Sequence, residues 1–123
     1  IASWNVNSVK ARLAHVQTFL SKTIPDVLFL QEIKGETLPE ISVEYHAVYK
    51  GQKTYNGVAI LSRIPVSPIL QNLPGDDLDE QARYLEVEWQ NIRLINIYLP
   101  NGNPVETEKF NYILVNAFSF IIK

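Results

Sequence analysis

The stretch Val27-Leu28-Phe29-Leu30-Gln31-Glu32 is a run of apolar residues that ends at an amide and a carboxylate. A continuous apolar run of this length is typical of a strand that is covered on both faces. In open α/β sheets, ligands bind outside the carboxyl ends of the strands, which is where these two polar residues would lie. The stretch therefore predicts an α/β fold with a functional site at the carboxyl end of this strand.

The residues before this strand extend the same pattern. Residues 1–5 are expected to form a short buried strand, and residues 9–22 a helix whose apolar positions recur at helical spacing. Asn7 or Ser8 can cap the start of this helix. Ile24-Pro25 is expected to end it, because the residue before a proline avoids the helical region.

The residues after this strand predict further strands separated by turns. Strands are expected over residues 45–50, 58–61, 83–90 and 92–99. Turn signals occur at Asn56-Gly57, at 74–77 and at Gln90-Asn91. Pro65 and Pro68 are expected to break the chain between two of these strands. A last helix is expected to begin near Asn103, with an apolar stripe formed by Phe110, Ile113, Leu114, Ala117 and Ile121.

The composition bounds the class of protein. The chain has 123 residues, of which 46% are hydrophobic, and 11 Lys and Arg nearly balance 13 Asp and Glu. This composition is typical of a globular chain, and it excludes a generic basic coat for nucleic acid. The absence of cysteine excludes disulfides and thiolate metal sites. With no long apolar run and no signal peptide, we expect a cytoplasmic protein that does not contact a membrane.

Polar side chains follow several of the expected strands. Asn5 ends the first strand and Glu32 the second, while Asn96 and Tyr98 share one face of a later strand with Asn101 just beyond it. Oxygen ligands of this kind suit Mg²⁺, which keeps several waters and needs only one or two protein carboxylates. Taken singly, these residues are equally compatible with a loop boundary, a helix cap and a half-buried aromatic.

Five motifs in a fixed order are more specific. They are Ser3-Trp4-Asn5-Val6-Asn7-Ser8, Leu30-Gln31-Glu32-Ile33-Lys34, Tyr55-Asn56-Gly57-Val58-Ala59-Ile60-Leu61-Ser62, Asp79-Glu80-Gln81-Ala82-Arg83-Tyr84 and Tyr98-Leu99-Pro100-Asn101-Gly102-Asn103-Pro104. Together they resemble the exonuclease III family of bacterial exodeoxyribonucleases and abasic-site endonucleases, within the endonuclease/exonuclease/phosphatase superfamily. The resemblance covers essentially the whole chain.

This resemblance implies roles for individual residues. Glu32 would bind the catalytic Mg²⁺ or Mn²⁺, and Asn5 would orient the metal-site carboxylates and the phosphate. Tyr98 would donate a hydrogen bond to an oxygen of the scissile phosphate. Asn101 would contact the phosphate or the DNA backbone, and Asn7 would stand near the metal. Positions that would face DNA are Lys10, Lys34, Tyr55 and Arg83.

The reaction implied is metal-assisted hydrolysis of phosphodiesters in double-stranded DNA, at 3′ ends and at abasic sites. A superfamily member acting on a phosphoinositide or sphingolipid is an alternative, which the motifs beginning at Asp79 and Tyr98 disfavour. A different class of alternative is a catalytically inactive fragment or DNA-binding remnant. His15 and His46 lie outside the motifs, so we expect both to be surface residues rather than catalytic ones.

The resemblance also implies motifs that these residues lack. The family carries an Asp-x-Asn motif and a terminal Asp-His pair in its second half, and neither occurs here. We therefore expect residues 1–123 to be the N-terminal part of one domain, the first half of a four-layer α/β sandwich, and inactive alone. Such a half would contribute mainly one sheet, whose inner face would be uncovered and prone to self-association.

Overall fold

The computed structural model describes residues 1–101 and residue 108, in which helix α1 (Val9–Thr23) accompanies two β-sheets. The larger sheet has the strand order β1 (Ala2–Asn5), β2 (Val27–Gln31), β4 (Val58–Ser62) and β3 (His46–Lys50). β1 and β2 are parallel, whereas β4 is antiparallel to both its neighbours. The smaller, antiparallel sheet has the order β5 (Ser67–Leu70), β6 (Tyr84–Trp89) and β7 (Ile92–Ile97). The predicted α/β class is confirmed.

The boundaries of α1 have local causes. At its start, Ser8 accepts a hydrogen bond on Oγ from the backbone N–H of Ala11 at 3.4 Å, which confirms one of the two predicted caps. At its end, Ile24 has a left-handed φ of 45°, and its N–H donates to the carbonyl of Leu20. The proline at position 25 follows this left-handed residue, so the helix ends where the sequence predicts.

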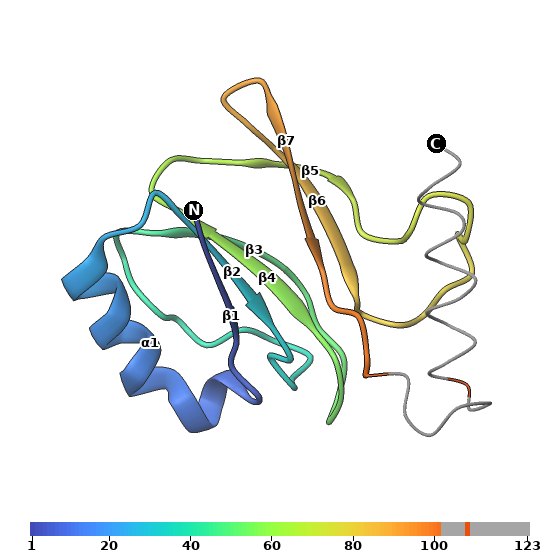
Figure 1. Ribbon diagram of the computed structural model, residues 1–123, viewed down its shortest axis with the longest axis horizontal. Coiled ribbons are helices and arrows are strands. Elements are labelled where there is room, and N and C mark those ends of the chain that lie inside the picture. Colours follow the sequence, from blue (N-terminus) through green and yellow to red (C-terminus); the bar gives the residue numbers. More distant parts are fainter. Residues whose placement is uncertain (102–107, 109–123) are drawn as a thin grey trace.

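Each face of the larger sheet is covered by a different layer (Figure 1). On one face, Leu28 and Leu30 of β2 belong to the apolar core that includes Val16 and Leu20 of α1. On the other face, the core between the two sheets contains Val27, Val58, Ile60, Leu85, Val87 and Leu94, with Phe29 packed against it. Because β2 sends alternate side chains into both cores, the prediction of a strand covered on both faces is confirmed.

The expectation of mainly one sheet with an uncovered inner face is wrong. The β6–β7 hairpin forms part of a second sheet, and Leu85, Val87 and Leu94 pack on the inner face of the larger one. The alternation of β6 and β7 predicts a half-buried hairpin but not which sheet the hairpin joins. Because this inner face is covered, it gives no reason to expect self-association.

Two connections in the smaller sheet differ in how well the sequence predicts them. Gln90 and Asn91 both have positive φ, 48° and 63°, as the two central residues of a tight hairpin require, so this predicted turn is confirmed. Pro68, expected to break the chain, lies within β5 instead. β5 is an edge strand with a register shift between Pro68 and Leu70, the setting in which a sheet tolerates proline.

The expectations that remain concern the last helix and contact with a membrane. The helix predicted to begin near Asn103, with its apolar stripe, lies outside the described residues. Within residues 1–101 and at residue 108, no helix has the length and apolar character needed to span a membrane.

Candidate active site

A cavity of about 630 Å³ lies beside the loop that follows β2 and the end of β7. Its walls include five residues singled out in the sequence, namely Glu32, Lys34, Tyr55, Arg83 and Tyr98. These residues come from four separate segments of the chain. The fold thus brings distant motifs together around one cavity.

Backbone hydrogen bonds hold the loop that carries Glu32. The N–H of Ser8 donates to the carbonyl of Glu32 at 2.8 Å, and the N–H of Ile33 donates to the carbonyl of Gly57 at 3.2 Å. Glu32 and Lys34 both have left-handed backbones, with φ of 54° and 51°. A left-handed backbone is unfavourable for such side chains and persists only where surrounding structure enforces it. The loop is therefore fixed from two sides before any ligand arrives.

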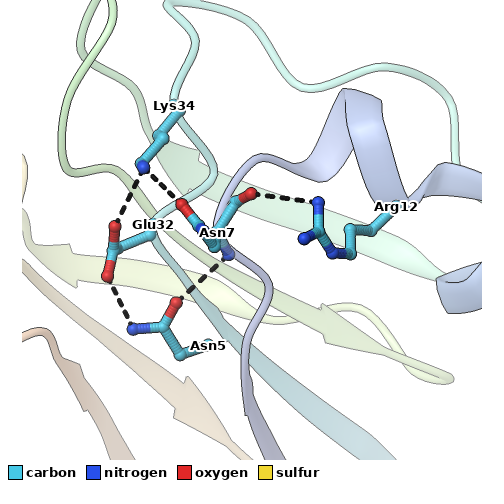
Figure 2. A network of polar contacts seen from close by, with 5 residues as sticks. All are labelled: Asn5, Asn7, Arg12, Glu32 and Lys34. Atoms are coloured by element: carbon cyan, nitrogen blue, oxygen red, sulfur yellow. Dashed lines mark hydrogen bonds and ion pairs between the residues drawn. The ribbon is translucent and has the colours of Figure 1, made fainter.

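The side chains around Glu32 form a connected polar network (Figure 2). Asn5 donates from Nδ2 to Oε1 of Glu32 at 2.8 Å, and the ammonium of Lys34 lies 3.3 Å from Oε2. Lys34 also donates to Oδ1 of Asn7, whose backbone N–H in turn donates to Oδ1 of Asn5 at 3.1 Å. The first two motifs therefore meet at one carboxylate.

Tyr98 approaches Glu32 from the smaller sheet. Its backbone N–H donates to the carbonyl of Arg83 at 2.8 Å, and the Arg83 guanidinium carbon lies 5.6 Å from the centre of the Tyr98 ring. The Tyr98 hydroxyl interacts with the carboxylate of Glu32. The Tyr98 side chain thus contacts the Glu32 carboxylate and the Arg83 guanidinium, and all three residues line the cavity.

The electrostatic environment favours a charged Glu32 and a protonated Tyr98. Partial burial of the Glu32 carboxyl acts to raise its pKa. Hydrogen bonds from Asn5 and Tyr98, and the nearby Lys34 ammonium, outweigh the burial and hold this pKa below its ordinary value. Burial, together with the Glu32 carboxylate, raises the pKa of the Tyr98 hydroxyl. The pair therefore offers a negative acceptor beside a neutral donor.

The donor set around Glu32 fits a hard divalent cation. The Lys34 ammonium already bridges oxygen atoms of Glu32 and Asn7, which shows that these oxygens together accept a positive charge. Oxygen atoms of this kind are what Mg²⁺ prefers, and Mg²⁺ completes its shell with water. Within the part of the chain that the structure describes, no three His, Asp or Glu residues cluster to form a larger metal site.

Other predicted residues lie away from the cavity walls. Lys10 is exposed in the first turn of α1, and Asn101 is exposed just after Pro100, which lines the cavity. His15 and His46 are exposed on α1 and β3, as the sequence predicts. Asn96 lies on β7, two residues before Tyr98, and is buried between the sheets rather than in the cavity wall.

A group of amide side chains in the cavity wall was not predicted as functional. Asn56 donates from Nδ2 to Oε1 of Gln52 at 2.8 Å and to Oε1 of Gln81 at 2.7 Å. Asn56 and Gln81 occur in the recognised motifs, but side-chain amides at these spacings are also ordinary turn residues. Only the folded chain brings the three amides together.

Comparison with known proteins identifies the family of the chain. The sequence model of the Endonuclease/Exonuclease/phosphatase family matches residues 2–117. The chain is 37% identical over 109 residues to the exodeoxyribonuclease III of Haemophilus influenzae, a match covering 81% of this chain and 41% of that protein.

Solved structures of exonucleases and AP endonucleases also match the chain. The 3′-5′ exonuclease NExo from Neisseria meningitidis matches with a TM-score of 0.88 at 37% identity, over 96% of this chain and 48% of that one. An AP endonuclease from Archaeoglobus fulgidus matches with a TM-score of 0.87 at 32% identity, over the same shares. The chain thus spans about half the length of these relatives. The resemblance to exonuclease III proteins is confirmed, and the chain belongs to the Endonuclease/Exonuclease/phosphatase family.

Proposed function

We propose that the chain carries the metal-binding and phosphate-binding part of a divalent-cation-dependent DNA phosphodiesterase. One observation supports this most strongly: the Glu32 carboxylate is held by Asn5 and Lys34 and faced by the Tyr98 hydroxyl beside an open cavity. A carboxylate that stays charged suits a cation, and a phenol that keeps its proton suits a phosphate oxygen.

Glu32 would hold Mg²⁺ or Mn²⁺, with Asn5 fixing the carboxylate and Asn7 beside it. When bound, such a cation neutralises charge on phosphate oxygens and makes water a better nucleophile. Asn5 Nδ2 donates to Oε1 of Glu32, which restrains the rotation of the carboxylate. The chain's own residues would thus hold the ligand oxygens in place before the cation binds.

The remaining residues would bind the phosphodiester. The Tyr98 hydroxyl, with its raised pKa, would donate to a phosphate oxygen and keep its proton at neutral pH. Lys34 and Arg83 place two positive charges in the cavity wall, and Tyr55 presents an aromatic ring that is 67% exposed. Positive charges bind the backbone and aromatic rings stack on bases, regardless of sequence. Lys10 and Asn101 would contact the backbone beyond the cavity.

The substrate we infer is double-stranded DNA with abasic sites or free 3′ ends, as in base excision repair. Relatives include the exodeoxyribonuclease III of Haemophilus influenzae, the AP endonuclease of Archaeoglobus fulgidus and a Neisseria 3′ phosphatase bound to a product DNA hairpin. Their names describe action on DNA ends or on AP sites. The positive side chains of Lys34 and Arg83 in the cavity wall would contact the phosphate backbone, which carries no sequence information.

The test compares the chain with Glu32→Gln and a control, Glu36→Gln, an exposed acid in the same loop. Each is mixed with a fluorescent duplex that carries an abasic-site analogue, in Mg²⁺ and in EDTA, and its affinity is read by anisotropy. We expect Mg²⁺ to tighten binding by the chain and by Glu36→Gln but not by Glu32→Gln, because cation and DNA would favour each other's binding. Equal Mg²⁺ effects in all three proteins would overturn the proposal.

The same samples separate catalysis from binding. Mg²⁺-dependent cleavage that Glu32→Gln abolishes would show that these residues suffice for hydrolysis. Binding without cleavage would favour the alternative of a DNA-binding part that lacks the Asp-x-Asn and Asp-His motifs.

A further inference from the structure

We propose that Asn96 and Gln31 are positioning residues that hold Glu32 opposite Tyr98 by bridging the two sheets behind the cavity. This inference rests on the proposed function, because it assigns these residues a role in the same site. It concerns a polar contact within an interface whose core is apolar and in which Trp89 Nε1 of β6 also donates to Oγ of Ser62 on β4 at 3.0 Å.

The bridge is centred on a buried side chain. Asn96 lies on β7 and is 1% exposed. Its Nδ2 donates to the carbonyl of Leu30 on β2 at 2.9 Å and to the carbonyl of Ala59 on β4 at 2.8 Å. Its Oδ1 accepts a hydrogen bond from Nε2 of Gln31 at 2.8 Å. A side chain of the smaller sheet thus binds two neighbouring strands of the larger sheet.

Gln31 ties this contact to a third strand of the larger sheet. Its Nε2 also donates to Oγ of Ser3 on β1 at 3.0 Å. The two amides therefore connect β7 with β1, β2 and β4 through directional contacts. Apolar contacts between sheets are not directional, so they resist separation of the sheets better than sliding. The hydrogen bonds of Asn96 and Gln31 fix the position of one sheet on the other at the end that carries Glu32, while the bond from Trp89 to Ser62 joins the two sheets elsewhere.

The two bridging residues are close in the chain to Glu32 and Tyr98, the carboxylate and the hydroxyl of the proposed site. Gln31 is followed in sequence by Glu32. Asn96 precedes Tyr98 by two residues, and Tyr98 comes directly after the end of β7 at Ile97. Leu94, Asn96 and Tyr98 all face the larger sheet, since Leu94 and Tyr98 belong to or pack on the core between the sheets. A slide of one sheet would separate the Tyr98 hydroxyl from Glu32, and a misplacement of about 1 Å can cost a hundredfold in rate.

The test needs variants that separate positioning from simple loss of stability. Asn96→Leu has nearly the same shape as the native side chain but removes the bridge. Leu94→Ala is the matched control, because it weakens the same interface on the same strand and leaves the bridge in place. Gln31→Met is a second variant that keeps the bonds from Asn96 to the two carbonyls, in case Asn96→Leu fails to fold.

The primary readout is the nuclear Overhauser effect between the Glu32 side chain and the Tyr98 ring, measured on the isotopically labelled chain. We expect it in the native chain and in Leu94→Ala, and we expect it to weaken or vanish in Asn96→Leu and Gln31→Met. An unchanged signal in the folded bridge variants would overturn the inference. This readout needs no activity, so an inactive chain with the expected signals contradicts only the proposed function.

If the chain cleaves the abasic duplex, the kinetics of cleavage provide a second, independent test of how these residues act. If the residues act through Tyr98, Asn96→Leu lowers kcat about tenfold or more without a matching rise in KM, and Leu94→Ala does not. In a Tyr98→Phe background, Asn96→Leu should then add little further loss, because both changes remove the same contact. Additive losses would contradict positioning through Tyr98.

Discussion

The ammonium of Lys34 lies 3.3 Å from Oε2 of Glu32 and donates a further hydrogen bond to Oδ1 of Asn7 (Figure 2). It therefore lies among the oxygens that we propose as ligands of a divalent cation. In that position the ammonium balances the charge of the carboxylate, and it competes with any cation that binds there.

Lys34→Met is accordingly expected to tighten the binding of Mn²⁺. An ion pair of this exposure is worth up to about 1 kcal/mol, so the gain should be about two- to fivefold in affinity. Titration of Mn²⁺ followed by electron paramagnetic resonance measures the free ion directly. Lys22→Met, an exposed substitution in the last turn of α1, is the control and should leave the affinity unchanged. Weaker Mn²⁺ binding by Lys34→Met would show that the ammonium assists the site rather than competing in it.

Gly57→Ala should both destabilise the chain and disturb the site. Gly57 has a φ of +90°, and an added Cβ would lie 2.4 Å from Cγ1 of Ile33. We expect a loss of about 1–3 kcal/mol in the free energy of unfolding, from backbone strain and overpacking. Because the Gly57 carbonyl accepts the N–H of Ile33, Mn²⁺ affinity at Glu32 should fall as well.

Gly35→Ala serves as the comparison for that substitution. Its added Cβ would meet the carbonyl oxygen of Thr37 at 3.3 Å, a far milder contact. Urea unfolding of both variants should give the smaller loss for Gly35→Ala. Equal losses in the two would mean that the left-handed turn at Gly57 contributes no particular constraint.

Lys50 gives the stability a dependence on pH. Burial lowers the pKa of its ammonium below 10.5, and the Asp79 carboxylate opposes this only in part. Between the folded-state pKa and 10.5 the unfolded chain binds more protons, so stability gains from Lys50 as the pH rises through this window. The free energy of unfolding of the native chain, minus that of Lys50→Met, should therefore increase with pH. A difference that falls over this range would refute the burial of Lys50.

Ile60→Ala tests the core between the two sheets. Ile60 is fully buried on β4 and belongs to the core shared with Leu85 and Val87 of β6. Its truncation should cost about 2–5 kcal/mol by lost burial and by the cavity left behind. Ile92→Ala, at an exposed position on β7, should change the free energy of unfolding by about 0.5 kcal/mol or less. A small loss at Ile60 would mean that the sheets do not pack on each other in solution.

Much of the local structure could be predicted from the sequence, because its causes are local. The apolar run before Gln31 is buried on both faces as a strand covered by a layer on each side. Asn91 and Gly57 occupy turns that need positive φ, which these residue types tolerate. A helix cap at Asn7 or Ser8 follows from the type of these side chains, and the fold decides for Ser8. Pro68 was misjudged because an edge strand accepts proline, and edge position is a property of the whole sheet.

The site could be predicted only in part, for the same physical reason. Glu32, Lys34 and Tyr98 belong to recognisable motifs, and these residues do line one cavity. The second sheet and the roles of Asn96 and Gln31 depend on contacts between strands more than sixty residues apart. Neither periodicity nor composition encodes which carbonyl a buried amide will reach.

The most direct test of the central claim is Mn²⁺ binding to the chain and to Glu32→Gln, with Glu36→Gln as control. Electron paramagnetic resonance of free Mn²⁺ gives the number of sites and their affinity without requiring catalysis. We predict one site in the chain and in Glu36→Gln, and its loss in Glu32→Gln, because an amide cannot replace the charge of the carboxylate. The account is contradicted if the chain binds no Mn²⁺, or if Glu32→Gln binds it as tightly as the native chain.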